Sequence, residues 1–284
     1  MVYNSSVERF VNTGIEGECM SAIKIAVANQ KGGVGKTTST IEIATILSDL
    51  DKKVLVIDFD QQCNLSTDVG ADMDKPSIYD LFVDEDPDME NGIQHTEDGF
   101  DIIAGSESMS KADTEFSDTP DMYLLGDLME ALEDNYDYII VDNGPARDKL
   151  LNMSYLAADY FIMCIDTSED SVKGINAIVK DMMKYHKAGK KSLSKAKILG
   201  VIMSRYRKTS IGNTIIEIMQ DTLRDDVDPI LKTEEEPFVM TVREAAVVDE
   251  AKVFKKSVQN YKRYSNPAID YRAIVDEIVR RAEG

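Results

Sequence analysis

The stretch that decides the fold is Asn29-Gln30-Lys31-Gly32-Gly33-Val34-Gly35-Lys36-Thr37-Thr38. It follows an apolar run at residues 22–28 and precedes a segment of helical period from Thr37 to about Leu50. Strand, glycine loop and helix in this order are what a phosphate-binding loop requires. The glycines let successive backbone N–H groups turn toward an anion, and the helix N-terminus adds its positive end. The sequence therefore predicts a phosphate-binding loop at residues 29–38.

Two side chains of this loop have defined roles if it binds a nucleotide. Lys36 would reach the β- and γ-phosphates, and the Thr37 hydroxyl would bind Mg²⁺. The loop departs from the usual G-x-x-x-x-G-K-[ST] pattern, because Gln30 replaces the first glycine and an additional lysine, Lys31, follows it. An ordinary turn that binds nothing is the alternative, and the strand and helix on either side make it the weaker one.

Carboxylates follow two further apolar runs. The run at residues 52–59 is followed by Asp60 and contains Asp58, and the run at residues 136–141 ends in Asp142. Ligands of open parallel sheets bind beyond the carboxyl ends of the strands, so these acids are expected to face the nucleotide. Asp142 is in the position of a carboxylate that holds Mg²⁺. A helix cap is the alternative role for Asp58 and Asp60.

The remaining elements give the alternating rhythm of a parallel α/β sheet. We expect strands at residues 100–104, 158–166 and 196–203 and a short last strand at 229–233, with helices near 77–82, 122–134 and 171–186. The fold class predicted is α/β, a single doubly wound, mostly parallel sheet with flanking helices.

The glycine loop resembles the deviant Walker A motif of the ParA/MinD family of P-loop ATPases, and most closely that of the ParA/Soj partition branch. The segments at residues 58–64 and 142–145 are similar to the family's two switches, D-x-D-P-Q-G-N and D-x-P-P. Gln61, Cys63 and Gly144 depart from those patterns. Residues 242–245 resemble the V-R-E-A element of partition ATPases. The resemblance runs from about residue 20 to the C-terminus, which implies one ATPase domain at 20–284 and a flexible N-terminal extension at 1–19.

The resemblance implies ATP and Mg²⁺ as cofactors and assigns residues to them. It implies that Lys31 acts across a dimer interface on the partner's phosphates, and that Asp60 orients the attacking water or the Mg²⁺ shell. Catalytic residues are then Lys31, Lys36 and Asp60, and the metal site comprises Thr37, Asp60 and Asp142. The nucleotide-binding set is Lys31, Gly32, Gly33, Val34, Gly35, Lys36, Thr37, Thr38 and Met203, with Met203 at the start of the adenine pocket.

The net charge of −20 is unevenly distributed along the chain. Residues 1–150 hold 10 Lys/Arg and 32 Asp/Glu, whereas residues 151–284 hold 22 and 20. Two basic runs, at 182–216 and 252–263, contain no acid. A local basic face can bind phosphate backbones whatever the total charge, although two solvated helix faces are the alternative. The candidate DNA contacts are Lys187, Lys190, Lys191, Arg205, Arg207, Lys208, Lys252, Lys255 and Lys256.

Nothing in the sequence indicates export or membrane insertion. There is no secretory signal, no apolar run of membrane-spanning length, and three widely spaced cysteines form no disulfide or metal pattern. We expect a bacterial cytoplasmic, nucleoid-associated protein. The C-terminal segment has apolar residues at helical spacing from Tyr271 to Val279, and docking on the core is favoured over a membrane-targeting tail because acids interleave this stripe.

Three functional hypotheses follow. The first is an ATP-dependent homodimer that binds double-stranded DNA without sequence preference, hydrolyses ATP slowly under partner stimulation, and segregates plasmid or chromosomal DNA with a ParB-like adaptor. The second is a MinD-like or cargo-positioning ATPase that acts on a membrane or on protein clusters. The third is a nucleotide-dependent scaffold with little hydrolysis.

Overall fold

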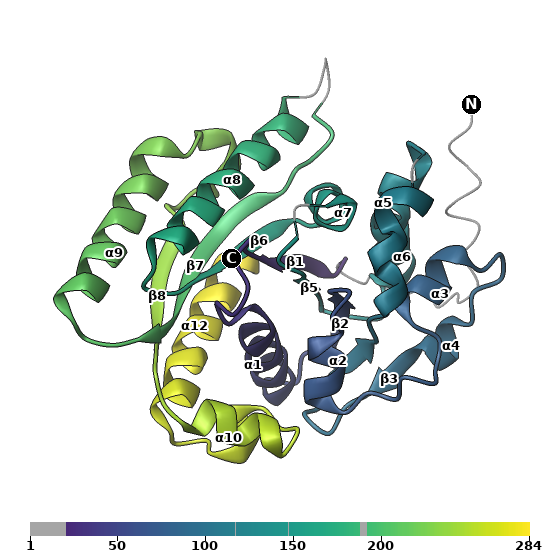
Figure 1. Cartoon of the computed structure of the whole chain (residues 1–284), viewed down its shortest axis with the longest axis horizontal. Helices are drawn as coiled ribbons and strands as arrows, with labels where there is room; N and C mark the ends of the chain where they lie inside the picture. The colour runs from purple at the N-terminus through teal and green to yellow at the C-terminus, as the bar shows by residue number, and fades with distance from the viewer. Residues whose placement is uncertain (1–20, 117, 147, 188–191) are drawn as a thin grey trace.

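The apolar runs of the sequence form the strands of a single sheet in the computed structural model, which describes residues 21–116, 118–146, 148–187 and 192–284 (Figure 1). Within these residues the sheet has eight strands in the order β3-β4-β2-β5-β1-β6-β7-β8, and only the β3–β4 pair is antiparallel. This confirms the predicted fold class. The strands are β1 Ile23–Ala28, β2 Val54–Phe59, β3 Ile93–His95, β4 Asp101–Ile103, β5 Tyr138–Asn143, β6 Tyr160–Ile165, β7 Lys197–Tyr206 and β8 Phe238–Arg243.

Helices cover both faces of the sheet. Side chains alternate between the two faces along a strand, so a strand of apolar residues needs covering on both. Ile25 and Val27 of β1 lie in a core with α1 and α12, whereas Ala26 and Ala28 lie in a core with α7, α8 and α9. The α-helices are α1 Lys36–Asp49, α2 Asn64–Val69, α3 Ile78–Val83, α4 Met89–Gly92, α5 Ala112–Glu115, α6 Leu124–Leu132, α7 Lys149–Ala157, α8 Glu169–His186, α9 Ser210–Asp221, α10 Val247–Val253, α11 Val258–Tyr261 and α12 Asn266–Ala282. Short 3₁₀ turns occupy Glu107–Lys111, Pro120–Tyr123 and Pro229–Leu231, and a π-helical turn occupies Thr222–Asp226.

The strand predicted at residues 229–233 is wrong. Pro229 begins a 3₁₀ turn in which the Ile230 N–H donates to the Asp228 side chain, and only Lys232 forms an isolated bridge to Ile198. The last strand of the sheet is β8, which lies beside β7 and includes the Val242-Arg243 pair. The predicted extension at residues 1–19 lies outside the described residues.

The C-terminal helix α12 docks on the core as expected. Tyr271, Ile274, Val275 and Ile278 are buried, and α12 lies beside α1 and β8 (Figure 1). Burying this stripe against α1 uses the apolar face that a membrane-binding helix would need. Within the described parts of the chain, the structure has no helix that could cross a bilayer.

A buried carboxylate joins α1 to the segment that contains α10 and α11. The Glu42 side chain accepts hydrogen bonds from the backbone N–H groups of Val258 and Gln259, at the start of α11. Asp98 holds the same turn by accepting bonds from the Ser257 N–H and hydroxyl at 2.8 and 2.9 Å. Glu42 is therefore an anchor between the helix that follows the glycine loop and the segment that contains α10.

We expect the thermal stability of an E42Q variant to depend less on pH than that of the unsubstituted chain. Burial raises the pKa of Glu42 from its usual 4.5 to about 8. The folded state then holds a proton that the unfolded state has lost, so stability falls as the pH rises from about 4.5 to 8. Glutamine does not titrate. Between pH 5 and pH 8.5 the melting temperature of the unsubstituted chain should fall further than that of E42Q, by at least roughly 2 °C. If the melting temperatures of the two proteins changed equally with pH, the raised pKa of Glu42 would be contradicted.

Candidate functional site

The glycine loop lies at the carboxyl end of β1, between the ends of β5 and β6. Gly33 and Gly35 have φ of 74° and 85°, the left-handed region that favours glycine. A Cβ added to Gly35 would lie 2.9 Å from the Ser204 Cβ. Ser204, at the end of β7, donates a 2.8 Å hydrogen bond to the Val34 carbonyl. The loop conformation therefore depends on glycine and on a contact with β7.

The structure brings Lys36, Thr37 and Asp142 together at the start of α1. The Thr37 hydroxyl donates to Asp142 Oδ2 at 2.7 Å, and the buried Lys36 ammonium donates to the Lys31 carbonyl at 3.2 Å. Burial, and next the Asp58 carboxylate nearby, raise the pKa of Asp142 to about 7. Lys36 and the Thr37 hydroxyl offset this rise only in part, and a further cation beside Asp142 would favour its ionised form.

The oxygens of Thr37 and Asp142 fit Mg²⁺, which prefers oxygen ligands. The part of the chain that the structure describes contains no cluster of three His, Cys, Asp or Glu residues that could hold a metal by itself. Mg²⁺ in proteins is usually bound by one or two carboxylates together with water and phosphate oxygens.

The two acids of the first switch segment have different surroundings. Asp58 Oδ2 accepts bonds from the Ser66 N–H at 2.9 Å and from its hydroxyl at 2.6 Å, which fixes the first turn of α2. The helix-cap alternative therefore describes Asp58. Asp60 lies beyond the strand end, and its Oδ1 accepts the Gln62 N–H at 3.0 Å. Cys63, where the family has glycine, has φ of 51° and is the N-cap of α2.

Lys31 makes its charged contacts with the loop that follows β6. Its ammonium donates to Asp166 Oδ2 at 2.7 Å and to the Ser168 hydroxyl at 2.6 Å. Asp166 and Ser168 are more than a hundred residues away in the sequence, and no pattern pointed to them. The one feature of the sequence that could have indicated Asp166 and Ser168 is that both follow β6, a strand that neighbours β1. The side chain of Lys31 is 31% exposed, so the contact can open without disturbing the core.

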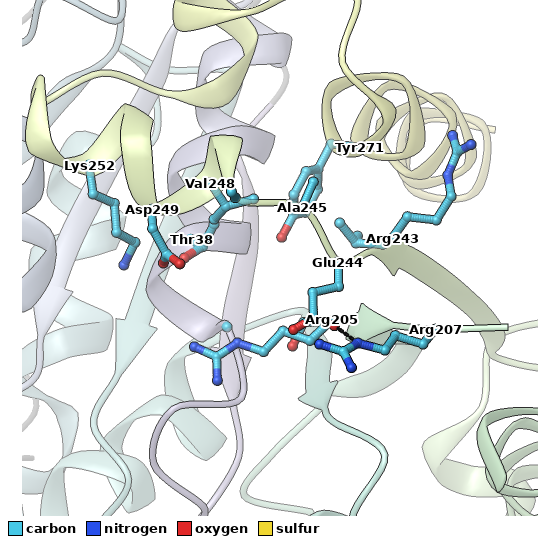
Figure 2. Close-up of a pocket in the computed structure, with 14 residues that line it drawn as sticks. Thr38, Arg205, Arg207, Arg243, Glu244, Ala245, Val248, Asp249, Lys252 and Tyr271 are labelled. Carbon is cyan, nitrogen blue, oxygen red and sulfur yellow. Dashed lines mark hydrogen bonds and ion pairs between the residues drawn. The ribbon is translucent and has the colours of Figure 1, made fainter. Parts of the chain in front are cut away.

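A cavity of about 690 Å³ adjoins the loop at Gly35 and Thr38. Figure 2 shows Thr38 facing Val248 and Asp249 of α10, with Arg205 and Arg207 on another side of the cavity. The Arg207 guanidinium is paired with Glu244, which belongs to the V-R-E-A element, and Arg243 is paired with Asp270. Both basic and acidic groups thus line a space next to the phosphate-binding loop.

Met203, predicted to line the adenine pocket, has its side chain fully buried in the core on the α8–α9 side of the sheet. Side chains alternate along a strand, so Ser204 lies on the face opposite Met203, and Ser204 and Arg205 line the cavity instead. Arg205 has φ of 52°, at an irregularity in the pairing of β7 with β8. Met203 therefore does not line the cavity, whereas its two neighbours at the same strand end do.

The candidate DNA contacts do not form one surface. Lys187 follows His186, which contacts Ala196 at the start of β7, whereas Arg205, Arg207 and Lys208 lie at its end. Ten residues of strand separate these ends by about 30 Å. Arg205, Arg207 and Lys252 line the cavity, and Lys255 and Lys256 are exposed at the end of α10. Lys190 and Lys191 lie outside the described residues.

Sequence comparisons place the chain among known ATPases. A family model described as AAA domain matches residues 22–195. The sporulation initiation inhibitor protein Soj of Bacillus subtilis is 30% identical over 209 residues, which cover 72% of this chain and 81% of Soj. The chromosome-partitioning ATPase Soj of Thermus thermophilus is 27% identical over 263 residues, which cover 92% of this chain and 96% of that protein.

Solved structures share the fold at lower identity. An ATP complex of a McdA variant from Cyanothece has a TM-score of 0.78 at 19% identity and covers 91% of this chain and 96% of that one. A cobyrinic acid a,c-diamide synthase from Mycobacterium smegmatis, bound to an ATP analog and magnesium, has a TM-score of 0.72 at 20% identity, with 93% and 96% covered. Because these proteins differ in function, this likeness establishes the fold alone.

Proposed function

Because the chain belongs to the ParA/Soj family of AAA-domain ATPases, shown by the family model and the Soj relatives, we propose that it is an ATP-dependent dimerising switch for DNA segregation. In this proposal two subunits close on two ATP molecules, the dimer binds double-stranded DNA without sequence preference, and hydrolysis, slow until a ParB-like adaptor stimulates it, separates the subunits. The observation that carries the proposal is the position of Lys31, a second lysine at the mouth of a loop that already contains Lys36.

ATP and Mg²⁺ fit the site described above. The backbone N–H groups of residues 32–38 would bind the phosphates, and Lys36 would leave the Lys31 carbonyl to bind the β- and γ-phosphates. The base and ribose would occupy the adjoining cavity between β7 and α10. Thr37 and Asp142 would hold Mg²⁺, which when bound neutralises charge on the phosphates.

Lys31 and Asp60 complete the site for hydrolysis. Within one subunit Lys36 already supplies a cation, so Lys31 is best explained by action on the partner's phosphates, as an arginine finger acts in other P-loop enzymes. To do so its ammonium must leave Asp166 and Ser168. Asp60, close beyond β2, would orient the attacking water.

The dimer is tested by sedimentation velocity with no nucleotide, with ADP and with a non-hydrolysable ATP analog. We expect dimers with the analog alone. A monomer under all three conditions would overturn the proposal, as would a dimer that ignores the nucleotide. Dimers that form with ATP but hydrolyse it no faster in the presence of any adaptor or DNA would favour a scaffold instead.

DNA binding is proposed for the exposed surface formed by the end of α10, α11 and the start of α12, which we call the α10–α12 surface. Lys255, Lys256 and Lys262 are exposed there, and none of them has an ion-pair partner among the described residues. Asp68 pairs with Lys252 and Asp49 with Arg263, so these two cations are partly neutralised. A dimer carries this surface twice, which raises the avidity for a long polyanion.

Charge reversal at this surface should weaken DNA binding. We expect the K255E/K256E/K262E variant to bind random-sequence duplex DNA at least about 10-fold more weakly near 0.1 M salt, with a smaller salt dependence, because each lost phosphate contact lowers the slope of log K against log salt by about 1. The matched control is K187E, which reverses one exposed charge near the start of β7. Equal loss in the control, or none in the triple variant, would assign DNA binding elsewhere. Both are measured by fluorescence anisotropy with ATP.

A further inference from the structure

The catalytic carboxylate proposed above touches the second switch segment at a glycine. A Cβ added to Gly144 would lie 2.9 Å from Asp60 Oδ1, closer than such atoms approach in folded proteins, and 3.2 Å from Asp60 Cγ, closer than in most of them. Gly144 stands where the family pattern D-x-P-P has its first proline. The two switch segments, more than eighty residues apart in the sequence, therefore meet at a point with room for a hydrogen atom alone.

The need for glycine here comes from space and not from backbone conformation. The described glycines with positive φ are Gly33, Gly35, Gly70 and Gly99, so Gly144 has a backbone that other residues can adopt. A glycine kept only to make the loop flexible would have open space around its α-carbon, as Gly32 does. At Gly144 the neighbour is the side chain proposed to orient water.

The structure also indicates which side would move if the space were filled. Asn143, the residue before Gly144, is fully held at the end of β5, because it accepts from the Ser154 hydroxyl at 2.6 Å and donates to the Val27 carbonyl at 3.2 Å. The backbone of Asp60 is held by the Cys63 N–H, which donates to its carbonyl at 2.9 Å. The part that can move is therefore the Asp60 side chain, which would have to rotate and lose the hydrogen bond that the Gln62 N–H donates to it.

We propose that Gly144 is a positioning residue, which sets the orientation of the Asp60 carboxylate by leaving it room against the second switch segment. This inference rests on the proposed role of Asp60 in hydrolysis. The contact also means that a movement of either switch segment is felt by the other.

The test compares steady-state hydrolysis by the G144A variant with that of the unsubstituted chain. A misplacement of about 1 Å at a reacting group costs up to about 10²-fold in rate, so we expect kcat of G144A to fall by at least about 10-fold while KM for ATP changes little. Gly126→Ala is the matched control, because its added Cβ would lie at an ordinary 3.8 Å from Ala157. Melting temperatures identify any variant that fails to fold.

Epistasis with Asp60 separates positioning from a general loss of structure. In a D60A background the added Cβ has no carboxylate to displace, so G144A should cause no further loss of kcat. If D60A lowers kcat and G144A alone does not, or if the two losses multiply in the double variant, Gly144 has no positioning role. If D60A itself leaves kcat unchanged, the proposed role of Asp60 fails, and with it the premise of this inference.

Discussion

A K31A variant is expected to bind ATP almost normally and to hydrolyse it about 10³-fold or more slowly than the unsubstituted chain. The magnitude is that of an arginine finger supplied across an interface, which is worth about 10³–10⁵ in rate. Binding survives because Lys36, Thr37 and the glycine backbone remain, and the Lys31 ammonium donates to Asp166 and Ser168 and not to these groups. The measurements are single-turnover hydrolysis at saturating ATP and the affinity for a fluorescent ATP analog.

The matched control for K31A is K36A, in the same loop. Lys36 is buried beside the phosphate site, so its loss should abolish nucleotide binding itself. The two lysines therefore separate binding from catalysis. A K31A variant that hydrolyses ATP at the unsubstituted rate would contradict the assignment of Lys31 to the partner's phosphates. If K31A and K36A both lose binding, the two lysines serve one subunit.

A D60A variant is expected to form a dimer with ATP that persists after the unsubstituted dimer has dissociated. Without the carboxylate the attacking water is not oriented, and a general-base residue typically contributes about 10²–10⁴-fold in rate. Hydrolysis is what separates the subunits, so its loss should trap the ATP-bound dimer. Size-exclusion chromatography at intervals after ATP addition measures this lifetime.

The control for D60A is D58N, which changes the other acid of the same segment. Asp58 holds Ser66 and the first turn of α2, so D58N should lower the melting temperature. It should prolong the dimer much less than D60A does. A D60A dimer that dissociates as fast as the unsubstituted one would contradict the catalytic role of Asp60. This outcome would favour the scaffold hypothesis.

The sequence was sufficient for the parts of the site that are local or fixed by strand ends. The glycine loop, Thr37 and Asp142 could be predicted because a strand before and a helix after define where each side chain lies. The parallel sheet followed from apolar runs alternating with helical segments. The docking of α12 followed from the spacing of its apolar residues, which are buried.

Contacts between distant segments could not be predicted from the sequence. The pairing of Lys31 with Asp166, of Glu42 with the start of α11, and of Gly144 with Asp60 depends on strand order and loop paths. The apolar run at residues 229–233 suggested a strand, but Pro229 and the Asp228 cap favour a 3₁₀ turn. The acid-free run at residues 182–216 is divided by the ten-residue strand β7, which its lack of acids could not reveal.

The most direct test of the proposed switch is binding to random-sequence duplex DNA with ATP, with ADP and without nucleotide, across a salt series. We expect binding with ATP alone, with an affinity that falls steeply as salt rises, because counterion release from phosphates supplies the free energy. Equal binding under all three conditions would contradict a nucleotide switch. Absence of binding, with ATP-dependent dimers still forming, would contradict DNA as the partner, and anionic vesicles and protein cargo would then be the partners to test.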